Sequence, residues 1–210
     1  MLKTGIMNSL ETRLRKCIDK VVVAFAENPF HYFTEADVVA DLKYLLTQEL
    51  QEACESKDGI NMQLVHQEYP TFFKQKNVNR RGHYDIVVLN PEFIRSNHSW
   101  TIAKPGIGFD PNVKPFLAVV EAKLFYEGIA KNRANAVIKD LNKLESSKEN
   151  SDFMFYVHFQ RYLKNSLSPW KKYWPGIKQA AKQSSHVQTC FTIYWHSNEG
   201  KVETVRFGNW

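Results

Sequence analysis

The sequence is poor in cysteine, and this shortage argues against two classes of protein. Only Cys17, Cys54 and Cys190 occur among 210 residues, and they stand far apart. Their odd number, without a C-x-x-C motif or a Cys/His cluster, argues against a disulfide framework and against a zinc site. We therefore expect three reduced, buried thiols in a cytoplasmic protein.

Long apolar runs are also missing. No run approaches the ~18 residues that a membrane-spanning helix needs, so we expect no membrane partner. The segment MLKTGIMNSLETRLRK has no apolar core of about seven residues, so we expect no signal peptide. Internal repeats and low-complexity tracts are absent. A content of 43% hydrophobic and 24% charged residues is ordinary for one globular domain, here residues 1–210.

Residues 116–126, FLAVVEAKLFY, form a short apolar segment that predicts a buried strand. Because alternate residues of a strand share a face, Glu121 and Lys123 point the same way as Leu117 and Val119. Burying a carboxylate and an ammonium group costs free energy unless each finds a partner. The pair is therefore either a salt bridge at an exposed strand end or part of a functional site.

A second apolar segment, residues 82–90, also predicts a strand and carries one acid, Asp85. Neighbouring strands lie ~4.8 Å apart, so pairing of the two segments would bring Asp85 and Glu121 together, with Lys123 beside them. Two carboxylates this close repel unless a cation lies between them. Oxygen ligands of this kind suit Mg²⁺ or Mn²⁺.

The arrangement of Asp85 followed by Glu121-Ala122-Lys123 resembles the PD-(D/E)xK nuclease superfamily, which has the restriction-endonuclease-like fold. The resemblance covers roughly residues 34–159. Tyr84 stands where the proline that gives the family its name would be, and residues 91–114 form an insert between the two catalytic strands.

The resemblance implies metal-dependent hydrolysis of phosphodiester bonds in DNA or RNA, with DNA as the favoured partner. Asp85, Glu121 and the carbonyl of Ala122 would hold Mg²⁺ or Mn²⁺, Glu35 is a further candidate ligand, and Lys123 would position the attacking water or stabilise the transition state. The alternative is a catalytically silent protein of the same fold that binds nucleic acid or another protein. A homodimer is left open.

Three more polar residues are candidates for the same site. Glu35 follows the helix cap Thr34 and sits on that helix's apolar stripe, so it is either a first-turn acid favoured by the helix dipole or the acid that this family's first core helix often brings to the metal. Glu68, near the end of a predicted strand over residues 61–69, is a candidate for the outer edge of the site or a strand end in water. Lys143, on a predicted helix ending near Leu144, could support the site, but a surface ion pair with Asp140 is favoured.

Basic residues predict nucleic-acid contacts in two segments. The net charge of +6 favours a polyanionic partner, although a solvated surface accounts for it equally well. Four candidates precede the Asp85 strand and two more follow residue 170 among aromatic residues: Lys74, Lys76, Arg80, Arg81, Lys171 and Lys172. Trp100, inside the insert, either stacks on a base or packs the insert against the core.

The predicted elements follow the order helix, helix, three strands, helix, strand, helix and hairpin. This order favours an α/β sandwich with a central mixed sheet flanked by helices. The resemblance implies that this sandwich has three layers and is restriction-endonuclease-like. The segment 152–159 is apolar on both faces and should be a central strand. The last helix should begin near Ser168 and be interrupted at Pro175.

Overall fold

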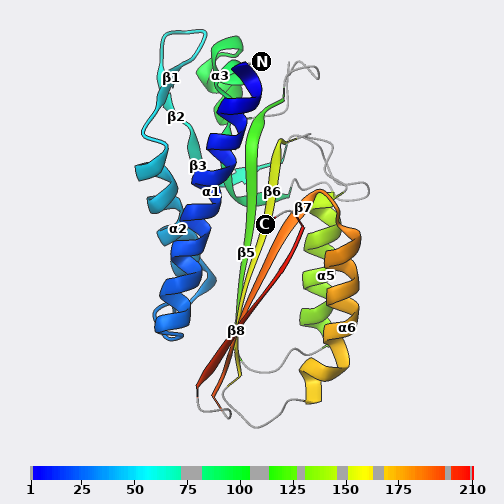
Figure 1. Cartoon of the computed structure of the whole chain (residues 1–210). Coiled ribbons are helices and arrows are strands. Elements are labelled where there is room, and N and C mark those ends of the chain that lie inside the picture. The colour runs from blue at the N-terminus through cyan, green and yellow to red at the C-terminus, as the bar shows by residue number, and fades with distance from the viewer. Residues whose placement is uncertain are drawn as a thin grey trace.

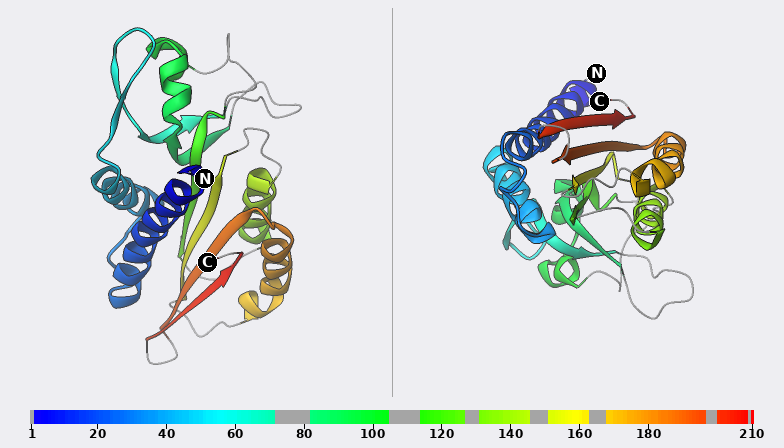
Figure 2. Two further views of the ribbon diagram at one scale, coloured as in Figure 1. Left: turned by 45° about the horizontal axis from the view of Figure 1, so that its top comes forward. Right: turned by 90° about the horizontal axis from the view of Figure 1, so that it is seen from below.

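A computed structural model describes residues 2–71, 82–104, 114–126, 131–145, 151–162, 168–196, 200–208 and 210. A mixed six-stranded sheet lies between two helical layers, α1 and α2 on one face and α5 and α6 on the other (Figures 1 and 2). The strands follow the order β3 (Val65–Pro70), β4 (His83–Leu89), β5 (Phe116–Tyr126), β6 (Phe153–Tyr162), β7 (Val187–Trp195) and β8 (Lys201–Phe207). The α/β class and the layered mixed sheet agree with the sequence prediction.

The first helical layer is built from two amphipathic helices, α1 (Leu2–Glu27) and α2 (Glu35–Glu49). Helix α1 begins before the start predicted near Asn8. Helix α2 has the expected cap, since Thr34 and Asp37 form reciprocal side-chain and backbone hydrogen bonds. The apolar stripes of both helices are buried: Leu14, Cys17, Ile18, Val21, Phe25, Val38, Val39, Leu42 and Leu46.

The second layer holds α5 (Lys131–Glu145) and α6 (Ser168–Gln183), which pack side by side. Helix α6 runs through Pro175, so the predicted interruption is wrong. Its buried face continues beyond the proline with Ile177, Ala180 and Ala181, and this packing outweighs one missing backbone hydrogen bond.

Several short elements escaped the sequence prediction. Residues 91–114 contain α3 (Pro91–Ser96) and α4 (Ser99–Ala103), and a small hairpin of β1 (Ala53–Glu55) and β2 (Asn61–Gln63) precedes β3, so the strand expected over 61–69 is divided. Phe93, Ile94 and Ile102 are fully buried, which anchors the two helices. Helices of one or two turns are too short to show a periodic pattern.

Strands β4 and β5 are hydrogen bonded to each other over only part of their length. Strand β4 pairs antiparallel with β5 from Leu89–Phe116 to Ile86–Val120. Strand β5 continues parallel to β6 as far as the pair Tyr126–Arg161, so β6 is central, as predicted. Beyond Val120, one edge of β5 therefore has no strand hydrogen bonded to it among the described residues.

The predicted environments of the cysteines agree with the structure. Cys17, Cys54 and Cys190 are free and buried. Among the residues that the structure describes, no helix combines the length and the apolar character needed to cross a membrane.

Candidate functional site

Two carboxylates close the open edge of β5. The backbone N–H of Ala122 donates a hydrogen bond to Asp85 Oδ2 over 2.7 Å, and the backbone of Leu124 donates to Glu35. These acids take the place of the carbonyl groups that a continuing β4 would have supplied. Because β4 and β5 separate here, the N–H groups of β5 need other acceptors, and Asp85 and Glu35 supply them.

Lys123 lies among the acids of the site. Its Nζ atom is 3.0 Å from Glu35 Oε1, 3.8 Å from Asp85 Oδ2 and 4.0 Å from Asp140 Oδ2. The four residues come from α2, β5, β4 and α5, so the N-terminal end of α2 reaches the face of the sheet that α5 covers. Asp85, Glu121 and Lys123 thus come together, and Glu35 joins them.

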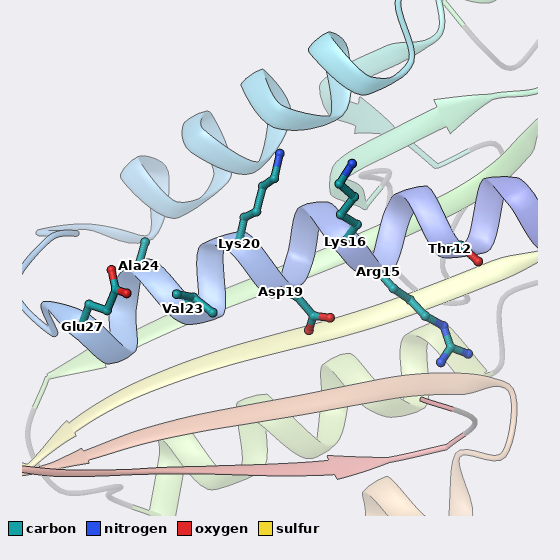
Figure 3. A pocket seen from close by; sticks show the side chains of 8 residues that line it. All are labelled: Thr12, Arg15, Lys16, Asp19, Lys20, Val23, Ala24 and Glu27. Carbon is teal, nitrogen blue, oxygen red and sulfur yellow. The ribbon is translucent and has the colours of Figure 1, made fainter.

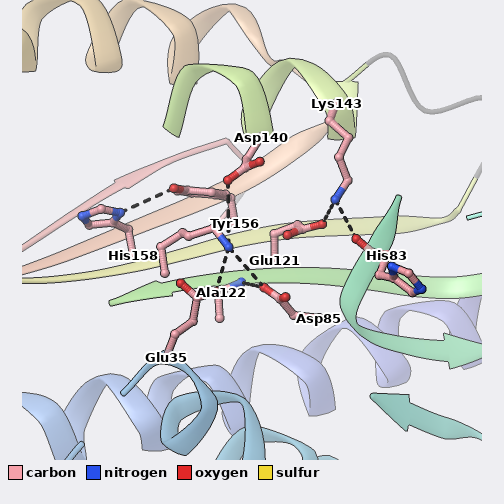
Figure 4. Close-up of polar contacts among 10 residues, drawn as sticks. Glu35, His83, Asp85, Glu121, Ala122, Asp140, Lys143, Tyr156 and His158 are labelled. Carbon is pink, nitrogen blue, oxygen red and sulfur yellow. Dashed lines mark hydrogen bonds and ion pairs between the residues drawn. The ribbon is translucent and has the colours of Figure 1, made fainter. Parts of the chain in front are cut away.

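Lys143 is the second cation of the site. Its ammonium group is hydrogen bonded to Glu121 Oε1 and to the backbone carbonyl of His83, the latter at 2.8 Å (Figure 4). Lys143 is 19% exposed and Glu121 only 3%. The favoured prediction was a surface ion pair of Lys143 with Asp140. Lys143 pairs with the buried Glu121 where α5 packs on the sheet, and its charge also opposes the raised pKa of Asp140. Together, Glu35, Asp85, Glu121, Lys123, Asp140 and Lys143 form what we call the acid–lysine cluster.

Negative charge exceeds positive charge in this cluster, since four carboxyl groups face two ammonium groups. Burial, together with the nearby Asp85 carboxylate, raises the pKa of Glu121 to about 8. Burial also raises the pKa of Glu35 and of Asp140, with Lys123 opposing both shifts. Burial alone would lower the pKa of Lys123, but Asp85 and Glu35 outweigh it and raise that pKa, so Lys123 stays charged.

Tyr156 and His158 of β6 form a buried wall beside the cluster. They pair in register with Glu121 and Lys123 on the same face of the sheet, and Tyr156 Oη lies 3.5 Å from His158 Nδ1 (Figure 4). Burial lowers the pKa of His158 to about 3, so the imidazole is neutral near pH 7. Sequence reasoning missed both residues, although polar residues at alternate positions of an apolar strand were a usable signal.

The oxygen donors fit a divalent cation in their chemistry. Asp85 and Glu121 are hard ligands of the kind that Mg²⁺ and Mn²⁺ prefer, and the cluster carries the excess negative charge that such an ion would neutralise. Within the described residues, no three His, Cys, Asp or Glu side chains already surround one point in metal-binding geometry. The two ammonium groups instead neutralise part of the acid charge.

The remaining predicted site residues lie elsewhere or outside the described part. Glu68 is exposed on β3, separated from β5 by β4, and has a φ of 53°. The segment with Lys74, Lys76, Arg80 and Arg81 lies outside the described residues, as does the side chain of Lys171. Lys172 lies over the ring of Tyr173 on α6, and Trp100, 62% exposed on α4, stacks against His98.

A shallow groove of about 580 Å³ runs along α1 (Figure 3). All the residues that line it belong to this one helix, and none belongs to the acid–lysine cluster: Thr12, Arg15, Lys16, Asp19, Lys20, Val23, Ala24 and Glu27. Both basic and acidic side chains line the groove, and none of them is buried.

Comparisons with protein-family models, with curated proteins and with solved structures find no match for this chain. The residues themselves are therefore the basis for inferring a function. A buried acid, a second acid and a lysine converge at the point where β4 and β5 part.

Proposed function

We propose that this protein is a metal-dependent nuclease of the PD-(D/E)xK type, which hydrolyses phosphodiester bonds in DNA or RNA. The observation that carries the proposal is the position of Asp85, Glu121 and Lys123 on one face of the sheet where β4 and β5 part. Glu35 adds a fourth functional group from the first turn of α2. Burying several charged groups together costs folding free energy, and such clusters are concentrated at functional sites.

Asp85 and Glu121 would hold the metal ion with the carbonyl of Ala122, and Glu35 would add a ligand from the open side. The chemistry that Mg²⁺ or Mn²⁺ supplies in such a site is a lowered pKa for a bound water and a positive charge beside the scissile phosphate. Asp85 is oriented for this role by the hydrogen bond from the Ala122 N–H group.

Lys123 would act on the reacting atoms directly. Its Nζ atom already lies among three carboxylates, so a water or phosphate oxygen held by those acids comes within its reach. Its ammonium group donates to the attacking water or to the oxyanion that forms on phosphorus. Lys143, which bridges Glu121 and the His83 carbonyl, keeps the buried carboxylate oriented.

The first test measures cleavage of single-stranded and double-stranded DNA and RNA with Mg²⁺, with Mn²⁺ or with EDTA. We expect cleavage that depends on the metal, and a loss of roughly 10²–10³-fold in rate for Lys123→Met, because a donor to the transition state is removed. Lys57→Met, at an exposed turn between β1 and β2, is the matched control and should cleave like the parent.

A second readout separates metal binding from catalysis. Mn²⁺ should raise the melting temperature of the parent, because a ligand of the folded state stabilises that state. Glu121→Gln should respond little. Equal responses from both proteins, together with an absence of cleavage in every metal, would refute the proposal. Binding of nucleic acid without any cleavage would favour the catalytically silent alternative.

A further inference from the structure

Residues 28–34, which connect α1 to α2, expose aromatic side chains directly before Glu35 of the acid–lysine cluster. Phe33 is 70% exposed, more than any other large apolar side chain that the structure describes, and Phe30 is 43% exposed. Leaving a phenyl ring in water forgoes the free energy that its burial would provide. Packing of the fold therefore gives no reason for Phe33 at this position.

Hydrogen bonds and a buried ring hold the backbone of this connection, so only the side-chain torsions of Phe33 are free to change. Tyr32 is 2% exposed, and its hydroxyl donates to Asp41 Oδ2 over 2.6 Å. The N–H groups of Phe33 and Thr34 both donate to Asp37 Oδ2, at 2.9 and 2.7 Å. A rigid aromatic side chain binds a partner at little cost in conformational entropy.

A buried positive charge lies beneath the same residues. Arg161 is 1% exposed, donates from Nη2 to the Tyr32 carbonyl over 2.6 Å, and lies between the rings of Phe30 and Tyr126, with its Cζ atom 5.4 and 4.1 Å from the two centroids. No carboxylate in the described part of the chain forms an ion pair with it. The connection therefore combines apolar rings with an uncompensated cation, which suits a polyanion with aromatic groups.

Phe33 is close in sequence to a residue of the acid–lysine cluster. Phe33 precedes Glu35 by two residues, and Glu35 contacts Lys123 at 3.0 Å. Two other aromatic side chains are strongly exposed among the described residues: Trp100 lies on α4 in the insert after β4, and Tyr44 lies further along α2. Of these exposed aromatic side chains, Phe33 is the one closest in sequence to a residue of the acid–lysine cluster.

We propose that residues 28–34 bind the nucleic-acid strand beside the cleaved bond, with the Phe33 ring stacked on an unpaired base and the charge of Arg161 attracting the flanking phosphates. This inference rests on the proposed nuclease function and narrows its substrate to nucleic acid with unpaired bases, such as a single strand or a frayed end. In a continuous duplex every base is already stacked on its neighbours, so Phe33 gains no contact there.

The test uses Lys123→Met protein in EDTA, so that no cleavage occurs during the measurement, and measures the Kd for short fluorescent oligonucleotides, either single-stranded or fully paired with closed ends. Loss of one base–aromatic stack should weaken single-strand binding by Phe33→Ala roughly 10-fold. Phe33→Trp retains an aromatic face and should bind like the parent. Tyr44→Ala removes another exposed aromatic ring, further along α2, and should change nothing.

Binding to the paired oligonucleotide should change less than about twofold in Phe33→Ala, since phosphate contacts remain. A base analogue whose fluorescence is quenched by stacking should lose that quenching in Phe33→Ala and keep it in Phe33→Trp. If Phe33→Ala binds single strands as tightly as the parent, or if Tyr44→Ala weakens binding equally, the inference is wrong.

The same variants in the cleaving protein separate the two proposals. Cleavage by the parent that is unaffected by Phe33→Ala on every substrate would refute the role of Phe33 and leave the nuclease function standing. An absence of cleavage and of binding to any nucleic acid would refute both.

Discussion

Neighbouring strands β5 and β6 each carry a buried charged side chain, and the two point to opposite faces of the sheet. Glu121 faces α5 and is 3% exposed, whereas Arg161 faces the connection between α1 and α2 and is 1% exposed. Glu121 is surrounded by other ionisable groups, and burial with the Asp85 charge raises its pKa to about 8. Arg161 is held by two aromatic rings and a backbone carbonyl.

The difference shows how a buried charge can serve stability or chemistry. The partners of Arg161 are fixed groups that cannot exchange a proton, so the guanidinium keeps one arrangement. The partners of Glu121 are a long lysine side chain and other carboxylates, and each of them can be replaced by a metal ion, a proton or a substrate oxygen. Variants of the two residues should therefore affect stability in opposite directions.

The largest change in the free energy of unfolding should come from Arg161→Ala. It leaves the buried Tyr32 carbonyl without its donor and opens space between Phe30 and Tyr126, so the free energy of unfolding should fall by about 3 kcal/mol. Urea denaturation measures this change. Arg133→Ala, an exposed arginine over the Phe125 ring, is the control and should cost less than about 1 kcal/mol. Similar losses for both would show that Arg161 is not an anchor of the fold.

Glu121→Gln should stabilise the metal-free protein, with an effect that depends on pH. Because the pKa of Glu121 is raised from 4.5 to about 8, the folded state binds more protons than the unfolded state in that window, and parent stability falls as pH rises through it. Glutamine does not titrate, so the variant should be more stable by roughly 2 kcal/mol at pH 8 and nearly equal to the parent near pH 4.5.

The control for this pH dependence is Glu203→Gln, at an exposed position of β8, which should follow the parent at every pH. Thermal unfolding in parallel buffers gives the comparison. A difference between Glu121→Gln and the parent that stays constant from pH 4.5 to 8 would show that the environment of Glu121 does not oppose its charge.

The smallest expected effect is the coupling energy between Lys143 and Glu121. Lys143→Met removes the ammonium group that faces the buried carboxylate, so it should destabilise the parent but should cost less when Glu121 is already glutamine. A double-mutant cycle at pH 8 should give a coupling energy of about 1 kcal/mol, measured by urea denaturation. A coupling energy near zero would mean that the two groups do not stabilise each other in solution.

The sequence predicted the part of the site that depends on local patterns. Alternation along an apolar strand put Glu121 and Lys123 on one face, and a helical stripe singled out Glu35. Asp140, Tyr156 and His158 could not be placed in the same way. Their positions depend on the register between β5 and β6 and on how α5 packs on the sheet, which local periodicity does not encode.

For the fold, the sequence likewise predicted only the elements that have a regular local pattern. Long helices and strands with regular apolar periods were found, including the central β6 and the hairpin of β7 and β8. The helices α3 and α4 and the hairpin of β1 and β2 were missed because each is held by a few buried side chains such as Phe93 and Ile102. The role of Arg161 was also missed, because it requires aromatic partners from distant segments.

The parting of β4 and β5 also bears on how the chain avoids aggregation. A strand edge with free N–H groups is a template to which another polypeptide can add a strand. Asp85 and Glu35 accept hydrogen bonds from the open edge of β5 and place charge where an incoming strand would have to lie. These two acids therefore also keep another strand from adding to this edge, and replacing either with an apolar residue would reduce solubility as well as alter the cluster.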